Sequence, residues 1–495
     1  MSASTSDDNR EILPRWRDLR GTLRAGEATP QADSSLAIRP GVDFFAEKEL
    51  VWKQEHSLSS ACDLVGAAIV WGREIAARDA ASYILAQHRE ATPASVAMAD
   101  RLLGGDDVPS ELAVADTGGI IRDLRRSLRF YPHNSLYWVD LARHYVNIGL
   151  LRKAMDSMLA ATSLAPNNRY VLRAAARLHT HAKDFDGAHD ILINSAATPG
   201  DPWLMAAEVS TAALAKRSPR YVKAARSMLD SRKFAAFDLG ELASALATLD
   251  YRSGGLRLSR KFFRLSLRAP SENVIAQARW ATTQKIIDVD SRIFLRPGSD
   301  EAQAWYHTYE SRWGAALEAG RRWLDDQPFS ANPCIHASFV ALFGLEDFAQ
   351  GLQIARVGLL ANPNEPGVLN NGAVAAANLG NLGLARDYLR RAAKQKDLRA
   401  GMGAVLVATG GLIAYRSGDR DEGRRLYKSA IDRARGNPTL VERARLSFAL
   451  EEIRSDPAEL DTQGLYSPEG EAADSSLVLL RERLAKALRE RRARV

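Results

Sequence analysis

The sequence predicts an all-α protein whose main body is an α-solenoid of stacked helix pairs. Helix-ending residues recur at a fixed interval, because Pro132, Pro166 and Gly200 lie 34 residues apart. Within each interval the apolar residues follow the i, i+3, i+4 spacing of amphipathic helices. Repeats of about 20–50 residues stack so that each unit contacts only its neighbours. A chain of 495 residues can therefore form one long repetitive body.

Residues 1–40 are expected to form a mostly disordered N-terminal segment. They carry Pro14, Pro30 and Pro40 among many Ser, Asp and Gly residues, a composition typical of mobile termini. Only a short helix is expected, around Ile12 to Leu23.

Residues 41–115 are expected to form a helical subdomain without repeats. Ser57 can cap a helix that begins with apolar residues at helical spacing. Thr92-Pro93 can open another, since proline suits the first turn of a helix.

The repetitive region, residues 116–453, resembles the tetratricopeptide repeat family. With Ser135 as the first position of a unit, small residues occupy the sites where two antiparallel helices come closest, and large residues fill the space between them. The family pattern is matched by Trp138, Leu141, Ala142, Tyr145, Ala154, Met158, Ala161 and Pro166. The match is strong for residues 135–168 and 366–399 and weak for 203–300. We expect about eight helix pairs, with an irregular loop at Asp288 to Gly298.

The C-terminal part divides into an acidic linker, residues 454–475, and a basic amphipathic helix, residues 476–495. Leu477, Leu480, Leu484 and Leu488 form an apolar stripe among arginines. Such a helix can cap the last repeat, bind a partner or a second copy, or contact an anionic membrane surface or nucleic acid.

Composition points to a cytoplasmic protein. The net charge is +7, which is too mild to indicate a nucleic-acid role without a clustered basic face. The two cysteines, Cys62 and Cys334, have neither disulfide-framework nor zinc spacing. The start of the chain lacks the pattern of a signal peptide, and no apolar run has the ~20 residues of a transmembrane helix.

Motifs for chemistry are scarce, so we expect no enzyme, no cofactor and no metal. The sequence has no Walker A loop, no His-Glu-x-x-His and no Gly-x-Ser-x-Gly. His179, His181 and His189 cluster with Asp184, Asp186 and Asp190. Imidazole and carboxylate are metal-ligand types, but we interpret these residues as part of a turn between two helices. Glu47, Glu49, Glu55 and His56 could form an acid–base set, although surface charge on an amphipathic helix explains them better.

The resemblance implies a ligand-binding groove lined by the first helix of each pair. The corresponding residues here are Val139, Arg143, Asn147, Tyr170, Arg173 and Arg177. Arg143 and Arg177 occupy the same position in consecutive units and are expected to be neighbours. Together with Asn147 they resemble a groove that holds an acidic or C-terminal peptide end. Later units add His336, Asn370, Asn371 and Asn378 as a neutral polar wall for a peptide backbone.

The function most consistent with these features is a non-enzymatic, protein- or peptide-binding scaffold, adaptor or regulatory subunit. Two alternatives stay open. One is nucleic-acid binding through an Arg-rich inner face or the C-terminal helix. The other is an effector or enzyme with its site in residues 41–115.

Overall fold

The computed structural model describes residues 10–17, 44–71, 74–88, 90–91, 93–103, 117–231, 233–396, 398–455 and 475–492. Every regular element in these ranges is helical. The elements are α1 Phe44–Glu55, α2 Leu58–Trp71, η1 Glu74–Ala77, α3 Arg78–Ala86, α4 Pro93–Leu102, α5 Thr117–Phe130, α6 Ser135–Asn147, α7 Leu151–Leu164, α8 Arg169–His181, α9 Phe185–Ile193, η2 Thr198–Gly200, α10 Pro202–Leu214, α11 Val222–Asp230, α12 Ala236–Arg252, α13 Leu256–Ser266, α14 Glu272–Thr283, η3 Ser291–Leu295, α15 Asp300–Tyr309, α16 Trp313–Asp326, α17 Ala331–Phe339, η4 Val340–Gly344, α18 Phe348–Ala361, α19 Pro366–Asn378, α20 Leu382–Ala393, α21 Met402–Arg416, α22 Arg420–Arg433, α23 Pro438–Ser455 and α24 Ser475–Arg492.

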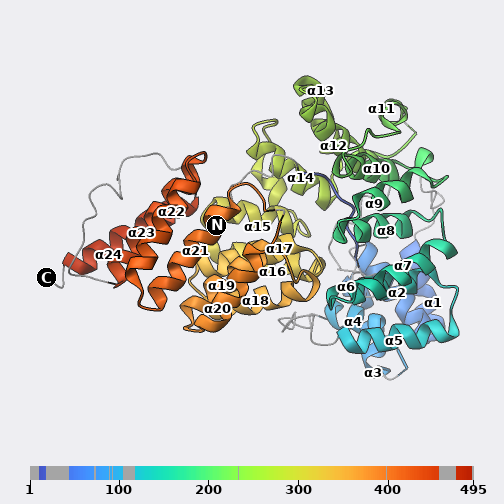
Figure 1. Ribbon diagram of the computed structural model, residues 1–495. Coiled ribbons are helices and arrows are strands. Elements are labelled where there is room, and N and C mark those ends of the chain that lie inside the picture. Colours follow the sequence, from blue (N-terminus) through green and yellow to red (C-terminus); the bar gives the residue numbers. More distant parts are fainter. Residues whose placement is uncertain are drawn as a thin grey trace.

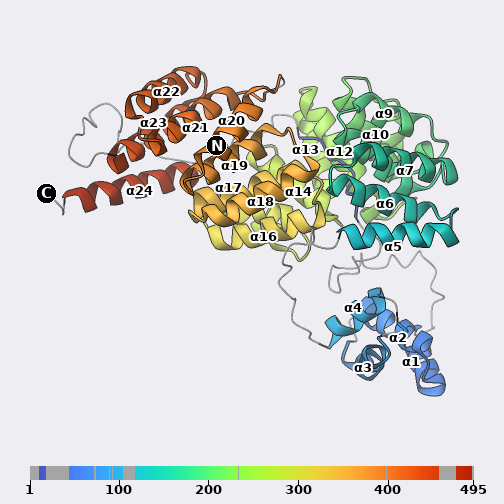
Figure 2. The same cartoon turned by 60° about the horizontal axis from the view of Figure 1, so that its bottom comes forward.

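Helices α1–α4 form a small helical block with its own core. Its buried residues, among them Trp52, Leu64 and Ile84, form one apolar cluster drawn only from this block. The Ser60 N–H donates to Ser57 Oγ at 3.1 Å, as expected of a residue that caps α2. Figure 2 shows the block below α5, beside the main body.

The main body stacks eight helix pairs: α6/α7, α8/α9, α10/α11, α12/α13, α15/α16, α17/α18, α19/α20 and α21/α22. Small residues allow the close approach within each pair. Ala142 and Ala154 are fully buried between α6 and α7, and a Cβ on Gly372 of α19 would lie 2.8 Å from the Tyr388 ring of α20. This close packing confirms the predicted α-solenoid of tetratricopeptide-like helix pairs.

The stack is interrupted after α14. That helix is followed by the short 3-10 turn η3 instead of a second α-helix. The turn lies within the predicted irregular loop, where Asp290 accepts the backbone N–H of Arg292 at 2.9 Å. The path of the solenoid can change here because no second helix fixes the next repeat against α14.

The solenoid curves until its first repeats touch its middle repeats. Arg143 of α6 donates from Nη2 to the Asp326 carbonyl at 2.8 Å, and Arg177 of α8 donates to Ser330 Oγ at 3.3 Å. Gly149 lies so close to α18 that a Cβ there would be 2.4 Å from the Leu360 carbonyl oxygen. The early helices α6–α9 therefore lie beside the middle helices α15–α18 (Figure 1), and we call the space between them, where a cavity lies, the inner channel.

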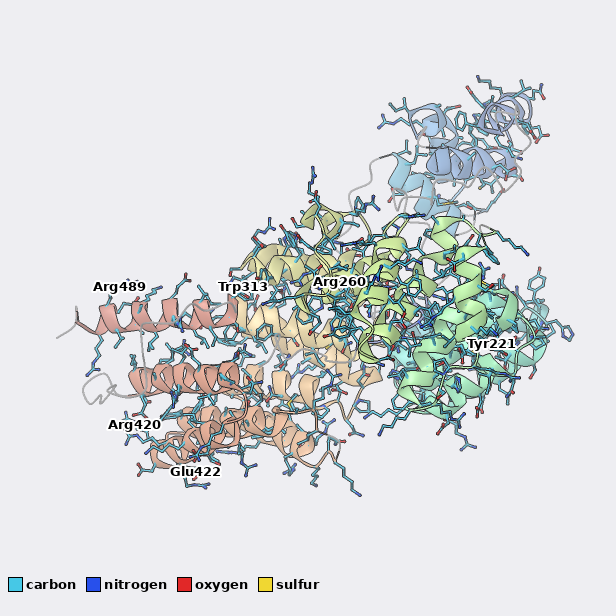
Figure 3. All side chains as sticks on the ribbon, turned by 90° about the horizontal axis from the view of Figure 1, so that it is seen from above. Tyr221, Arg260, Trp313, Arg420, Glu422 and Arg489 are labelled. Carbon is cyan, nitrogen blue, oxygen red and sulfur yellow. The ribbon has the colours of Figure 1, made fainter. Side chains whose placement is uncertain are left out.

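The last helix, α24, packs on α23. Leu477, Leu480 and Leu484 are buried in one cluster with residues of α23 such as Leu450. Arg483 stacks over the Phe343 ring, 5.6 Å from its centroid. Figure 3 marks Arg489 near the free end of α24 and Tyr221 toward the opposite end of the molecule. The predicted acidic linker falls almost entirely outside the described residues.

Candidate functional site

The inner channel is occupied by the chain's own N-terminal segment, residues 10–17. The segment has no helical structure, so the helix expected from Ile12 onward is wrong for these residues. Ile12, Pro14 and Trp16 are buried, while the residues between them are partly exposed. This alternation is typical of extended backbone, whose successive side chains point in opposite directions. In Figure 1 the segment is the dark blue trace between α14 and α8–α10.

Side chains of the channel wall hold the backbone of the segment. Asn273 Nδ2 donates to the Leu13 carbonyl at 2.7 Å, and Gln277 Nε2 donates to the Arg10 carbonyl at 3.0 Å. Arg143 Nε donates to the Trp16 carbonyl at 3.1 Å, and Tyr170 Oη to the Arg17 carbonyl at 2.6 Å. These bonds are made to main-chain carbonyls, which every residue has. They therefore fix the position of the segment along the channel without selecting its side chains.

An acidic cluster binds the arginines of the segment. Arg15 contacts three carboxylates on three helices: Glu301 Oε2 at 2.7 Å, Asp326 Oδ2 at 3.2 Å and Glu272 Oε1 at 3.2 Å. Glu272 and Glu301 lie in the first turns of α14 and α15, where the helix dipole stabilises negative charge. Asp326 ends α16, where the dipole opposes it. The charged form of Asp326 therefore depends more on the arginine than the charged forms of Glu272 and Glu301 do.

Two further arginines of the segment share the same carboxylates. Arg17 Nε donates to Asp326 Oδ1 at 2.9 Å, and its guanidinium also pairs with Glu272. Arg10 pairs with Glu301. Three cations thus face three largely buried carboxylates, so the charges within this cluster balance. We call Glu272, Glu301 and Asp326 the acidic triad.

Trp16 occupies an aromatic pocket at the junction of the early and middle repeats. Its side chain is fully buried, and its ring centroid lies 5.4 Å from that of Phe329. It belongs to the core cluster that contains Val139 of α6 and Ala361 of α18. Burying an indole of this size stabilises the fold by several kcal/mol at ~25 cal/mol per Å². Trp16 therefore joins two parts of the solenoid that are distant in sequence.

The electrostatics of the channel follow from burial and from these charges. Burial lowers the pKa of Arg15, but Glu272, Glu301 and Asp326 outweigh it, so the net shift is upward. For Arg177, burial and the nearby Arg15 outweigh the attraction of Glu301 and lower the pKa to about 10. Burial and the neighbouring Arg177 lower the pKa of His181 to about 4. The channel favours a cation where the triad lies and disfavours one at Arg177 and His181.

The structure brings Arg143, Tyr170 and Arg177 of α6 and α8 to the channel, with roles that differ from those expected. Val139 is fully buried beside Trp16, and Asn147 is half-buried at the end of α6. Arg143 and Tyr170 contact the segment as described above. Arg173 pairs with Glu241 at 2.8 Å and donates to the Trp203 carbonyl at 3.0 Å.

Arg143 bonds to the last carbonyl of α16, and Arg177 bonds to Ser330, the residue before α17. Arg177 lies over the Phe329 ring, 5.1 Å from its centroid. Neither arginine is presented to an acidic ligand, because Arg143 bonds to carbonyls and Arg177 to a hydroxyl and a ring. The bound segment carries a net positive charge, whereas the sequence analysis expected an acidic peptide at these two arginines.

The expected polar wall of the later units lies inside the stack. His336 is 2% exposed and lies 3.0 Å from Thr308 Oγ1. Asn370 accepts from Thr409 at 2.8 Å, and Asn371 donates to the Ile335 carbonyl at 3.0 Å. Asn378 accepts from Arg416 at 2.9 Å. These groups link neighbouring helices.

The residues considered as metal ligands or as an acid–base set do not come together in one site in the described part of the chain. Among the described residues no group of three or more His, Cys, Asp or Glu side chains could hold a metal ion. His179 contacts Asp184, whereas His189 is buried against Glu208. Glu47, Glu55 and His56 are exposed on the surface of the N-terminal block. In the described part of the chain, no helix combines the length and apolar character needed to cross a bilayer.

Space remains beside the bound segment. A cavity of about 260 Å³ is lined by Arg10, Leu13 and Arg15 on one side and by residues such as Leu214 and Asn332 on the other. The channel is thus wider than the backbone that it holds.

Sequence reasoning missed the segment because its prolines and polar neighbours are typical of a mobile terminus. One signal was present. Trp16 is the kind of large apolar residue that is seldom left in water, and it lies between two arginines. The acidic triad could not be recognised from sequence, because its members are separated by an irregular loop and by the turn between α15 and α16.

No protein-family model and no curated protein matches the chain. Solved structures with a similar arrangement of helices include yeast Tom70, with a TM-score of 0.31 and 14% identity over 76% of this chain and 93% of that one. The Cut9–Hcn1 hetero-tetramer of the APC/C gives a TM-score of 0.40 and 11% identity over 91% and 89%. The human IFIT1 dimer with PPP-AAAA gives a TM-score of 0.31 and 12% identity over 90% of this chain and 94% of that one.

Proposed function

We propose that this tetratricopeptide-like repeat protein is a non-enzymatic scaffold, adaptor or regulatory subunit that binds an extended segment of another protein in its inner channel. The observation that carries the proposal is the bound segment itself. Side chains from α6, α8 and α14 bond to its main-chain carbonyls, which is how a groove binds a peptide independently of most of its sequence.

The charge of the channel favours a basic protein segment over an acidic peptide or a nucleic acid. The acidic triad repels carboxylates and phosphates alike. Arg143, Arg173 and Arg177, which would have formed the Arg-rich inner face, are bonded to the protein's own carbonyls, hydroxyl and carboxylate groups. Counterion release from phosphates, the main source of affinity for nucleic acid, therefore gains little from these three arginines.

Photo-crosslinking from the channel tests the proposal in the full chain. A benzophenone amino acid in place of Asn332, which is exposed and lines the cavity, should give discrete protein adducts in cells. The matched control places the same group at Leu159, which is 68% exposed on α7. Adducts should persist after nuclease treatment. Identical adducts from both positions, or adducts that nuclease removes, would contradict a protein-binding channel.

A further inference from the structure

Residues 10–17 contact the channel in ways that a separate peptide with the same key side chains could reproduce, including the ion pair of Glu11 with Arg252. Side chains of the channel donate hydrogen bonds to main-chain carbonyls of the segment, which every peptide has. The arginines of the segment are bound through their guanidinium groups. The segment contributes one buried aromatic side chain, Trp16. Nothing in these contacts requires that the segment belong to the same chain.

We propose that residues 10–17 are an exchangeable internal ligand, and that the partner of the channel is an extended basic segment carrying an arginine, an aromatic residue and a second arginine in direct succession. This rests on the proposed function and specifies its partner and its regulation. The aromatic residue enters the Phe329 pocket, and the two arginines pair with the acidic triad.

The partner must be basic because the channel cannot be left empty at low cost. When residues 10–17 leave, Glu272, Glu301 and Asp326 lose three arginines at once, and removing the cations from buried carboxylates is strongly unfavourable. An incoming segment that restores these ion pairs removes the penalty, whereas a neutral or acidic peptide does not. The positive charge of the incoming segment is therefore the first requirement for exchange.

The order of residues in the partner follows from the geometry. Arg15 bonds to all three members of the triad, and Arg17 to two of them. Trp16, between them, points the other way and enters the aromatic pocket. An extended backbone places alternate side chains on opposite faces, so this arrangement requires the aromatic residue to stand between the two arginines.

Cutting the connection to the segment tests exchange without altering any contact in the channel. A site for a specific protease is placed between residues 17 and 44 of the full chain and cleaved after folding. A fluorescent peptide with the sequence of residues 8–19 is then added in excess, and fluorescence anisotropy follows its binding. The cleaved protein should take up the peptide, while the uncleaved protein should bind it about tenfold more weakly or not at all, since its own segment competes intramolecularly.

Peptide variants test the recognition rule. Arg15→Glu and Trp16→Ala in the peptide should each weaken binding about 100-fold, and a scrambled peptide of the same composition serves as the matched control. A control readout is circular dichroism of the cleaved protein, which should stay unchanged while peptides exchange.

Three outcomes overturn the inference. The labelled peptide fails to displace the resident segment, the protein unfolds when the segment leaves, or the segment binds only as part of a second intact copy. The first two would make residues 10–17 a permanent part of the fold. Protein adducts from the Asn332 position could still appear in those cases, so failure here is distinguishable from failure of the proposed function.

Discussion

Arg15 illustrates how one side chain can set the stability of a site. Its guanidinium contacts carboxylates from α14, α15 and α16, and only 11% of the side chain is exposed. A planar fork of donors suits this arrangement, because each edge of the group can meet a different carboxylate. Glu301 and Asp326 are also largely buried, so neither can exchange its arginine for water at low cost.

Replacing Arg15 should therefore destabilise the whole protein. Arg15→Ala removes an arginine that contacts all three carboxylates, while Arg10 and Arg17 stay paired with them. We therefore expect the free energy of unfolding to fall by about 2 kcal/mol, the scale of one or two charge-assisted hydrogen bonds. Urea denaturation measures the change. The matched control is Arg292→Ala, because Arg292 also pairs with an aspartate but is 88% exposed, and it should have no measurable effect. Equal effects of the two substitutions would contradict the role given to the triad.

A second prediction concerns His336, which is buried between Trp305 and Trp323. Burial lowers its pKa from 6.5 to about 4. The unfolded chain therefore takes up a proton in this pH range that the folded chain does not, and stability falls as pH decreases from 6.5 to 4. The expected loss from this residue between pH 7 and pH 5 is about 2 kcal/mol.

Urea denaturation at pH 7 and pH 5 checks the contribution of His336. In His336→Gln the loss of stability on acidification should be smaller by about the same amount. The control is His133→Gln, at an exposed histidine, which should keep the wild-type dependence on pH. A wild-type slope in His336→Gln would show that the pH dependence comes from other groups.

Helix pairs were the most predictable part of the molecule. The small residues at 142 and 154 and the helix-ending Pro166 identified a unit whose two helices are indeed α6 and α7. The interruption after Pro270 was also visible, because the spacing there departs from the repeat. The site was predicted less well. Arg143 and Tyr170 do line the channel, but sequence could not show that they bind the chain's own backbone, since those contacts join residues far apart.

Close packing within a pair can be tested on α17 and α18. A Cβ added to Gly358 would lie 2.1 Å from Cys334 Sγ, so Gly358→Val must separate the two helices at a cost of about 2 kcal/mol. Cys334 is fully buried, and burial raises its pKa to about 12. In a Cys62→Ser background, its reaction with a thiol reagent should therefore accelerate in the valine variant.

Gly314 supplies the control for this comparison. It also lies in a helix, α16, but a Cβ added there would have no described neighbour within 4 Å. Gly314→Ala should leave the reactivity of Cys334 unchanged and increase stability by up to about 1 kcal/mol, since alanine favours the helix. If the valine at 358 is tolerated equally well, the two helices are not packed as closely as described.

The curvature of the whole solenoid involves residues 10–17. Arg15 and Arg17 bind α14–α16, while the carbonyls of Trp16 and Arg17 are bonded to α6 and α8. The segment therefore holds together two parts of the repeat array that also touch directly through Arg143 and the Asp326 carbonyl.

Weakening these contacts should open the curve. In the full-length Arg15→Ala, Trp16→Ala variant, small-angle X-ray scattering should report a larger radius of gyration than in the wild type, with helix content unchanged by circular dichroism. Leu159→Ala, on the exposed side of α7, is the control and should keep the wild-type dimensions. An unchanged radius in the double variant would mean that direct contacts between the repeats are sufficient.

The distance along the chain between Arg15 and Asp326 also constrains how the protein is made. The two residues are 311 positions apart. At about 5–20 residues per second, a ribosome completes the aspartate roughly 15–60 s after the arginine. Arg15 is thus synthesised well before Asp326, and for that interval each nascent molecule carries Trp16 and its two flanking arginines without the residues that bind them. On a polysome, residues 10–17 of one nascent chain can therefore encounter the partly synthesised channel of a neighbouring chain before their own channel is complete.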